Sequence, residues 1–237
     1  MSEPLLEMAG VEKDYHTLRP LRIRDLTVRP GDVFSISGID MLGAETFVHL
    51  VTGATLPDAG DVSLFGRNTR SITDADAWLK SLDGVGMITA RGILIEAFSV
   101  LQNIALSLTL DVDPIDPRVI PQAGALARDV GIAANLFDLA LGAVAPDIKM
   151  RVHLARALAL GPQLLIAEHP SAALPRQSVA GFAADLGNVA RTRRLGLIAI
   201  TADDSMAKAV GGTRLELVAA TGELRTFSRI RRLFGGK

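Results

Sequence analysis

Two segments of the sequence carry residues whose types and spacing are suited to chemistry on phosphate. The first is a loop between Gly38 and Gly43, which follows an apolar strand and precedes a helix. The spacing G-x-x-x-x-G is that of a phosphate-binding loop, in which backbone N–H groups at a helix N-terminus hold the anion. In the full pattern, a Lys that bridges phosphates and a hydroxyl that binds Mg²⁺ come next. Here Ala44 and Glu45 stand at those two positions, and only Thr46 carries a hydroxyl.

Glu45 predicts an electrostatic obstacle at this loop. A carboxylate at the mouth of the helix would itself cap the helix dipole and compete with phosphate for the same N–H groups. At about 4 Å and an effective dielectric constant near 20, one pair of like charges costs on the order of 4 kcal/mol. That energy corresponds to several powers of ten in affinity, so we expect this loop to bind a phosphate ligand weakly or not at all.

The second segment is the end of a buried strand. Residues 164–167 form a short apolar run, and the polar Glu168 and His169 follow it. In a parallel sheet such residues emerge at the carboxyl edge, where α/β proteins place their chemistry. We therefore expect these two side chains to lie at a functional edge of the sheet.

Hydrophobic periodicity predicts the elements that position these residues. Residues 33–37 predict an apolar strand, and the helix after the glycine loop is expected to end at Gly53. Residues 151–158, RVHLARAL, predict a helix immediately before the strand that ends at Ala167. Residues 197–201 predict a further buried strand that lies between two helices.

The remaining segments predict a β-rich region followed by a helical one. The apolar residues of the segment 21–28 fall into two pairs, which predict two short antiparallel strands. A short amphipathic helix is expected around Trp78, the only tryptophan, and a strand over residues 85–89. Further along we expect helical segments at residues 99–108 and 122–141. Between them, residues 111–122 contain three prolines and predict a linker.

Composition limits the classes of function. The 237 residues suit one large α/β domain, or a domain with a small insertion. Zero cysteines exclude disulfides and thiolate metal sites, and the four histidines lack metal-like spacing. A net charge of −1 provides no overall field for nucleic acid. No apolar run approaches a bilayer span and no signal-peptide pattern is present, so we expect a cytosolic location.

The segment 226–237 is basic and amphipathic. Ile230, Leu233 and Phe234 recur at helical spacing among arginines. With so few apolar anchors we expect a partly ordered terminal helix, and the alternatives are a docking helix or a weak contact with an anionic surface.

The helix RVHLARAL, followed by the apolar run LLIA and by Pro170, is a specific combination. With it the sequence resembles the ATP-binding subunits of ABC transporters, in which a signature loop, a helix RVALARAL and a strand LLLLDEP occur in that order. Ordered matches extend from Val11 to about Leu224. Ala167, before the acidic residue, makes the sequence most similar to the short subgroup that exports lipids and lipoproteins.

The resemblance implies an α/β fold with a P-loop NTPase (RecA-like) core, an N-terminal antiparallel β-subdomain and an inserted helical subdomain. Residues 1–237 would form a single ABC-type nucleotide-binding domain. Within it, we expect the β-subdomain and the first part of the core at residues 1–90 and the helical subdomain at residues 91–150. The rest of the core is expected at residues 151–225 and the basic tail at residues 226–237.

The resemblance also implies roles for single positions, several of which hold unsuited residues. Tyr15 is expected to stack on adenine, with a half-buried strand-end aromatic as the alternative. Glu168 takes the place of the Walker B Asp and would bind Mg²⁺ if Mg-ATP binds, and His169 takes the place of the catalytic Glu. Ala90 stands where the Q-loop Gln belongs, and Ala202 stands where the switch His belongs.

The signature loop, which in the family faces the ATP of a second chain, is altered too. Aligned without gaps on RVHLARAL, the motif LSGGQ is replaced by Val144, Ala145, Pro146, Asp147 and Ile148. Both halves of a composite ATP site are therefore changed in one chain.

Three interpretations follow. The chain is a non-hydrolysing structural or regulatory subunit of a membrane transport complex, a divergent but active ATPase that uses Glu168 and Tyr15, or a protein-interaction module outside transport. Under the first interpretation, the chain is not expected to bind ATP and Mg²⁺ strongly. Its expected partners are a membrane permease and a second ABC subunit, as a homo- or heterodimer at the inner face of the membrane, and nucleic acid is not expected.

Overall fold

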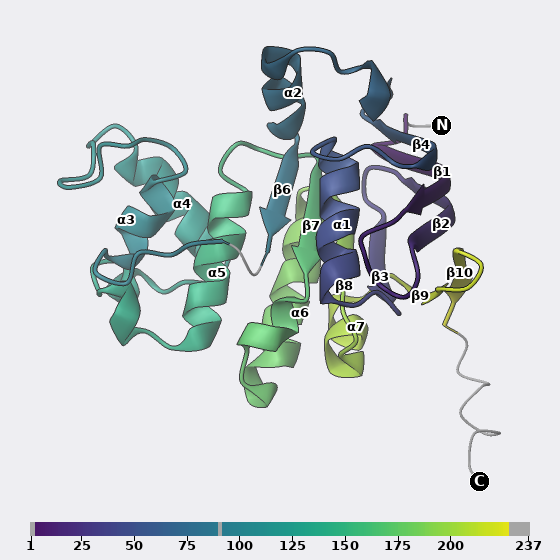
Figure 1. Ribbon diagram of the computed structural model, residues 1–237. Coiled ribbons are helices and arrows are strands. Elements are labelled where there is room, and N and C mark those ends of the chain that lie inside the picture. Colours follow the sequence, from purple (N-terminus) through teal and green to yellow (C-terminus); the bar gives the residue numbers. More distant parts are fainter. Residues whose placement is uncertain (1–2, 90–91, 228–237) are drawn as a thin grey trace, which may run out of the picture.

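The computed structural model describes residues 3–89 and 92–227, which form an antiparallel sheet, a larger parallel sheet and the helices around them (Figure 1). Two sequence expectations lie outside the described residues. The first is the assignment of Ala90 to the place of the Q-loop Gln. The second is the terminal helix expected over residues 226–237, because residues 228–237 are not described.

The antiparallel sheet is built from the N-terminal quarter of the chain. Its strands lie in the order β2-β1-β4-β5. Their bounds are β1 Leu6–Lys13, β2 Leu21–Val28, β4 Ala59–Leu64 and β5 Arg67–Asn68. The 3₁₀ turn η1, Thr69–Ser71, then leads to the helix α2, Ala75–Leu82.

The prediction of two short strands within residues 21–28 is wrong, because β2 is one continuous strand paired with β1. The buried face of β2 changes between Ile23 and Leu26, and that of β1 changes opposite it between Met8 and Val11. A change of face within one strand breaks the two-residue alternation, and that break was interpreted as the end of a strand.

The larger sheet has the strand order β10-β9-β3-β8-β7-β6. All neighbouring pairs are parallel except β9 and β10. The bounds are β3 Val33–Ser37, β6 Val85–Ile88, β7 Leu164–Glu168, β8 Gly196–Ile200, β9 Thr213–Val218 and β10 Glu223–Thr226. Strands β3, β7 and β8 are confirmed at the predicted positions.

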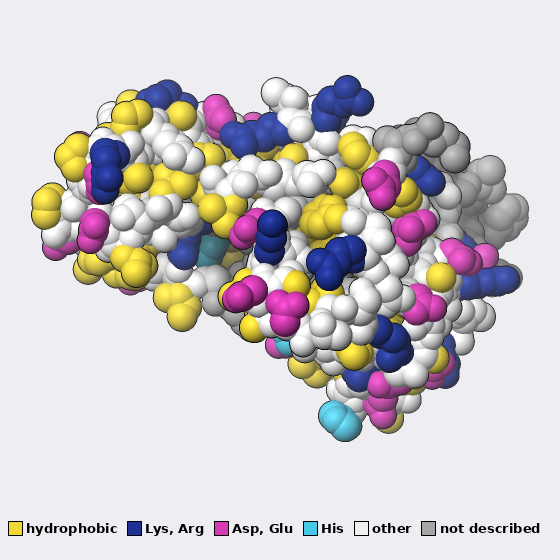
Figure 2. Space-filling view, turned by 90° about the horizontal axis from the view of Figure 1, so that it is seen from above, with side chains coloured by type: hydrophobic (Ala, Val, Ile, Leu, Met, Phe, Trp, Pro, Cys, Tyr) yellow, Lys and Arg dark blue, Asp and Glu magenta, His cyan; other side chains and the backbone are white. Residues whose placement is uncertain are grey.

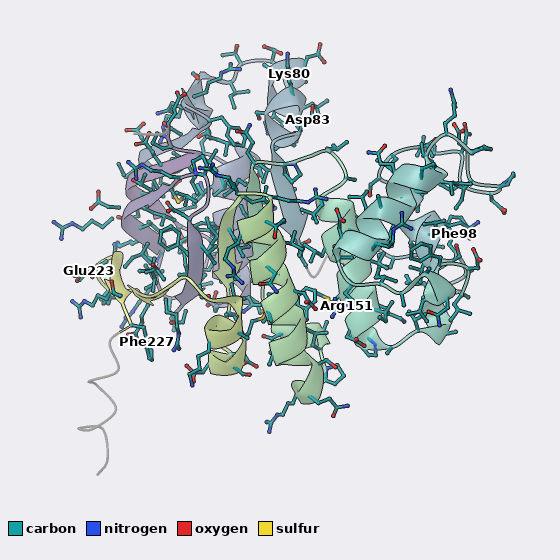
Figure 3. All side chains as sticks on the ribbon, turned by 180° about the vertical axis from the view of Figure 1, so that it is seen from behind. Lys80, Asp83, Phe98, Arg151, Glu223 and Phe227 are labelled. Atoms are coloured by element: carbon teal, nitrogen blue, oxygen red, sulfur yellow. The ribbon has the colours of Figure 1, made fainter. Side chains whose placement is uncertain are left out.

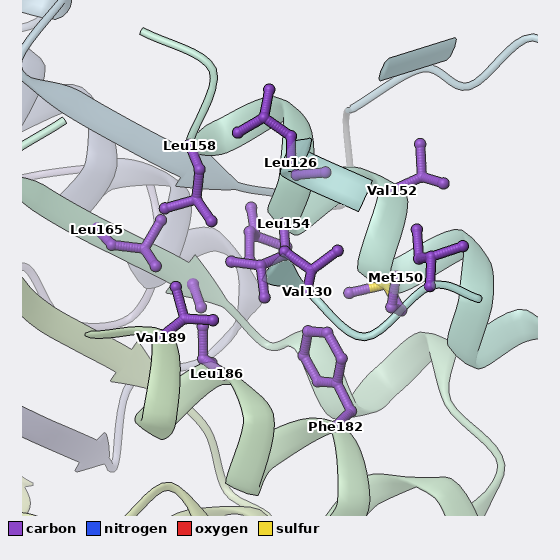
Figure 4. Close-up of a cluster of buried hydrophobic side chains, with 14 of the residues drawn as sticks. Leu126, Val130, Met150, Val152, Leu154, Leu158, Leu165, Phe182, Leu186 and Val189 are labelled. Carbon is purple, nitrogen blue, oxygen red and sulfur yellow. The ribbon is translucent and has the colours of Figure 1, made fainter. Parts of the chain in front are cut away.

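Each face of the parallel sheet packs against a different hydrophobic cluster, because successive side chains of a strand point to opposite faces. Leu164 and Ile166 of β7 belong to the cluster shared with the helix α1, Met41–Thr52, and with the antiparallel sheet. Leu165 and Ala167 belong to the other cluster, shared with α5, Pro146–Ala157, and α6, Arg176–Thr192 (Figure 4).

The remaining helices form a lobe beside the sheet and a cover at its end. The lobe contains α3, Val100–Ala105, and α4, Ile120–Asp129, which pack on α5, with the short turns η2, Ala134–Leu136, and η3, Leu141–Ala143 (Figure 1). The turn η4, Pro170–Ala173, follows β7, and α7, Asp204–Val210, follows β8. Arg151 of α5 ties the lobe to the core, because its guanidinium donates to the Val130 carbonyl and pairs with Asp185 of α6 (Figure 3).

The helix expected over residues 122–141 is shorter and begins earlier. α4 includes Pro121 in its first turn, where the missing N–H has no intrahelical acceptor to lose. It ends at Asp129 because Gly131 adopts a φ of 79°, a left-handed conformation that terminates helices. The later residues of the predicted segment form 3₁₀ turns instead.

Two glycines of α6 allow a matched test of the packing between α6 and α7. An added Cβ at Gly187 would lie 2.1 Å from the Val210 carbonyl oxygen, whereas nothing lies within 4 Å of one at Gly181. We expect Gly187→Ala to lower the free energy of unfolding by about 1–3 kcal/mol through overpacking. Gly181→Ala should raise it by up to about 1 kcal/mol because alanine favours the helix. Equal stability of the two variants in urea unfolding would contradict this packing.

Candidate functional site

The two chemistry-bearing segments meet at the carboxyl edge of the parallel sheet. Strand β3 leads into the loop that begins at Gly38, β7 ends at Glu168, and β8 leads to Thr201. Because β8 lies between β3 and β7, these positions are grouped at neighbouring strand ends. Gly38 has a φ of 85°, and a Cβ there would lie 2.6 Å from the Leu217 carbonyl oxygen of β9, so only glycine fits.

A carboxylate of the chain itself occupies the N-terminus of α1. Asp40 is the N-cap, and its Oδ1 accepts the Gly43 N–H at 2.7 Å. The Asp40 carbonyl accepts the Ala44 N–H at 2.8 Å. The helix begins at Met41, so Gly43 and Ala44 lie within its first turns rather than in a wide loop. The N–H of Gly43, which the glycine pattern would offer to a phosphate, is thus already bound to an anion.

The three residues after Gly43 do not face a ligand in the way their positions predicted. Ala44 is completely buried in the core cluster below α1. The hydroxyl of Thr46 donates to the Leu42 carbonyl at 2.9 Å. Glu45 is not the cap that we expected, because its Oε1 lies 4.0 Å from Nε2 of His49, one helical turn away, and Asp40 supplies the cap instead.

Tyr15 lies at the same loop and lines a pocket of about 480 Å³ together with Gly38 and Asp40. Its hydroxyl lies 3.3 Å from the position that a Cβ on Gly43 would take. The ring is half-buried beside the loop, which is compatible with both the adenine-stacking expectation and its alternative, a strand-end aromatic. Arg19 and the fully exposed Leu18 also line this pocket.

The end of β7 places one acidic and one basic side chain at the edge of the sheet. Glu168 is buried, with 4% of its surface exposed. His169 has a φ of 44°, and its N–H donates to the Ile200 carbonyl at 2.9 Å. Among the described residues, the buried Nε2 of His169 has no hydrogen-bond partner.

The segment after β8 carries a hydroxyl and an alanine methyl where the resemblance implied a histidine. Thr201 is buried, and its Oγ1 lies 3.3 Å from Ser171 Oγ and accepts the Asp203 N–H at 3.0 Å. Ala202 is exposed and offers no polar side chain.

The signature positions form the start of α5. Val144 precedes the helix, Ala145 is its N-cap without a side-chain hydrogen bond, and Pro146 is its first residue. Ala145 and Pro146 are exposed. Asp147 adds a negative charge to the first turn of α5, at the positive end of the helix dipole.

A groove of about 250 Å³ separates the helical lobe from the edge of the sheet. Met87 of β6 and His153 of α5 line it, together with Gly92 and the exposed Leu160. A Cβ on Gly92 would lie 2.9 Å from His153 Nδ1, so the loop passes directly over the imidazole. Burial, and to a smaller extent the charge of Arg156, lower the pKa of His153.

Sequence reasoning missed Asp40 and His153. An Asp three residues before Gly43 is an N-cap signal that was available in the sequence. His153 had no such signal, because its environment comes from Gly92, which is distant in sequence. In the described part of the chain, no group of three or more His, Cys, Asp or Glu residues could hold a metal ion.

Comparisons with known proteins add an independent view of the chain. No family model matches it. The lipoprotein-releasing system ATP-binding protein LolD 2 of Caulobacter vibrioides is 33% identical over 219 residues, which cover 87% of this chain and 90% of that protein. LolD of Acinetobacter baylyi is 27% identical over 212 residues, covering 88% and 92%.

Solved structures are similar in fold at lower identity. The dimeric ATP-binding cassette MJ0796, in a post-hydrolysis state with ADP and phosphate, has a TM-score of 0.72 and 19% identity, and covers 94% of this chain and 98% of its own. CbiO1 from Clostridium perfringens, part of the ABC transporter complex cbiONQ, has a TM-score of 0.77 and 18% identity, covering 98% and 91%.

The Asp40 cap predicts a measurable contribution to stability. Asp40→Ala should lower the free energy of unfolding by about 1 kcal/mol, because the Gly43 N–H loses its acceptor. Asp40→Asn retains an acceptor and should cost less. Denaturant unfolding measures both, with Asp76→Ala, an exposed acidic residue in the first turn of α2, as the control. If Asp40→Ala were as stable as the wild type, Asp40 would not act as a cap.

His153 predicts a pH dependence of stability. Its pKa in the folded chain is lowered from 6.5, so the unfolded chain takes up this proton at higher pH than the folded chain does. The contribution of neutral His153 to the free energy of unfolding is therefore fully present above about pH 6.5. It is lost as the pH falls from about 6.5 toward the lowered pKa of the folded chain. Relative to His153→Gln, the wild type should lose stability as the pH falls below about 6.5. The exposed His16→Gln is the control, and an unchanged difference between wild type and His153→Gln would contradict the prediction.

Proposed function

The chain belongs to the ATP-binding subunits of ABC transporters, and from that premise we propose that it is a non-hydrolysing member, a structural or regulatory subunit of a membrane transport complex. The observation that carries the proposal is the 2.7 Å hydrogen bond from the Gly43 N–H to the Asp40 carboxylate. An anion of the chain takes the donor that a phosphate would need, and it does so at the positive end of the α1 dipole.

The charges around this loop oppose a triphosphate. No Lys follows Gly43, while Asp40 and Glu45 both lie within the segment that would surround the phosphates. One like-charge pair at about 4 Å costs on the order of 4 kcal/mol at an effective dielectric constant of 20. That is about three powers of ten in affinity, and two carboxylates act in the same direction. We infer that the residues present do not fit Mg-ATP.

The residues expected to act on bound ATP do not replace the missing contacts. The imidazole of His169 is a potential proton acceptor, but it sits at a position where no Lys, Gln or switch His orients a water molecule. At the start of α5, Ala145 and Asp147 would face the ATP of a second chain with a methyl group and a negative charge. A partner with an intact phosphate loop would therefore also lack a proper signature opposite its nucleotide.

The partners that fit this role are a membrane permease and a second ABC subunit, with the chain peripheral to the cytoplasmic side of the membrane. In ABC transporters the helical subdomain receives the permease. Here the groove between lobe and sheet is lined by the exposed apolar residues Leu160, at 65% exposure, and Met87, at 38%. Dimeric cassettes such as MJ0796 support the second partner.

Among the described residues, no helix has both the length and the apolar character needed to cross a membrane.

One observation favours a second candidate, a divergent ATPase that still binds nucleotide. Tyr15 lines a pocket of about 480 Å³ beside the loop, and Glu168 is present at the end of β7. In that case Tyr15 would stack on adenine and Glu168 would bind Mg²⁺. Steady ATP turnover that is abolished by Glu168→Ala would establish this alternative.

Binding of Mg-ATP to the wild type separates the two candidates, and a lysine at position 44 tests whether the fold can accept the missing residue. We expect no saturable Mg-ATP binding by wild type below about 1 mM in calorimetry. Ala44→Lys should not restore binding, because position 44 is completely buried and a lysine there places a charge in the core. It should lower the free energy of unfolding by at least about 2 kcal/mol.

The matched control is Ala44→Met, which adds a chain of similar length without the charge. Sub-micromolar binding by wild type, or binding gained by a stable Ala44→Lys variant, would contradict the proposal.

A further inference from the structure

An apolar pocket lies beside α2, on the side of the antiparallel sheet, and the nucleotide chemistry does not use it. Its volume is about 390 Å³, and it is lined by the C-terminal end of α1, by η1 and by the start of α2. Trp78 forms one wall, and its indole N–H donates to the Thr52 carbonyl at 2.8 Å. The ring is thereby held in one orientation, and Leu56 and Ile72 line the pocket with it.

The helix α2 is incompletely covered for an element of its composition. None of its residues is buried, although it carries Trp78, Leu79 and Leu82. Leu79 is exposed by 54%, and Leu56 of the adjoining pocket by 41%. In Figure 1 the helix projects at one end of the molecule. A half-buried tryptophan next to the exposed Leu56 of the pocket is typical of a surface that binds a partner.

The charges around the pocket select the chemistry of that partner. Asp74 and Asp76 lie at the start of α2, whereas Asp83 lines the other groove, beside β6. Asp74 is the one charged residue among those that line the described pocket. Figure 2 looks down on this end of the molecule, where hydrophobic, acidic and basic side chains are mixed. The nearby cation, Arg70 of η1, already donates to the Pro57 carbonyl, so the carboxylates at the start of α2 favour an apolar side chain that is flanked by cations.

The chain itself carries a segment of this chemistry. Residues 228–237, which lie outside the described residues, contain Ile230, Leu233 and Phe234 between three arginines. The described chain leaves β10 on a different side of the molecule from α2 (Figure 1). A tail that continues from Phe227 starts on that other side, which favours the pocket of a second copy over the pocket of its own chain.

We propose that the pocket beside α2 binds the C-terminal tail, residues 228–237, of a second copy of this chain. The apolar residues of the tail fill the space next to Trp78, and its arginines face Asp74 and Asp76. This contact is independent of nucleotide, since the pocket is built from other residues than the phosphate loop.

The position of the sole tryptophan provides the direct experiment. A synthetic peptide of residues 228–237 is titrated into the chain truncated after Phe227, and Trp78 fluorescence is recorded. We expect a saturable change, which is lost when the three apolar residues of the peptide are replaced by serine. Truncation after Phe227 keeps all the helices and strands of the described fold, the last of which, β10, ends at Thr226.

Two exposed leucines provide matched variants. Leu56→Lys places a cation in the pocket and should weaken peptide binding about tenfold or more, whereas Leu79→Lys, on the same surface but outside the pocket lining, should leave it nearly unchanged. In light scattering, full-length chain should associate with increasing concentration, and truncated or Leu56→Lys chains alone should not. A mixture of truncated chain and full-length Leu56→Lys should form one-to-one dimers, because each supplies what the other lacks.

The proposal is overturned if the peptide leaves Trp78 fluorescence unchanged, or if Leu56→Lys and Leu79→Lys bind it equally. A concentration-independent effect of truncation on fluorescence would place the tail on its own chain and also overturn it. Binding of the peptide to anionic vesicles, without binding to the truncated chain, would assign the tail to a membrane surface instead.

Discussion

The hydrogen bond between the Asp40 carboxylate and the Gly43 N–H determines how this fold can be used. It satisfies a donor at the N-terminus of α1 that helices otherwise leave without an intrahelical partner. It also places a negative charge at the positive end of the helix dipole, so the helix is stabilised by the chain's own anion. In a phosphate-binding loop the same donor and the same dipole serve the ligand. Stability of the apo chain and affinity for phosphate therefore compete for one N–H group.

The rest of the site is consistent with that constraint. With the helix beginning at Met41, position 44 points into the core, where Ala44 packs without exposed surface. A lysine at that position would be buried, so its loss is coupled to the geometry of the helix start and is not an isolated change. The sheet does not depend on these residues, because β3, β7 and β8 are held by the two hydrophobic clusters on their faces. The scaffold therefore does not require particular residues at the edge of the sheet.

Much of the architecture could be predicted from the sequence, because long apolar strands and periodic helices depend on local patterns. β7 and α5 are found where the apolar run and RVHLARAL predicted them. The errors have tertiary causes. β2 changes its buried face opposite a matching change in β1, and α4 ends early at Gly131. At the site, the missing lysine could be read directly, but the assignment of the cap to Glu45 was wrong because Asp40 reaches the N–H groups first. The environment of His153 arises from contact with Gly92, which no local pattern encodes.

The Gly43 N–H donates to the Asp40 carboxylate and is therefore not available to a phosphate. The most direct measurement is a titration of the ¹⁵N-labelled chain with Mg-ATP, followed through the amide resonances of Gly43 and Ala44. In the wild-type chain both resonances should stay in place at millimolar Mg-ATP. The Asp40→Ala substitution itself should shift both resonances, because the contacts of Asp40 with these N–H groups change. A saturating shift of the two resonances in the wild-type chain at micromolar Mg-ATP would contradict this account.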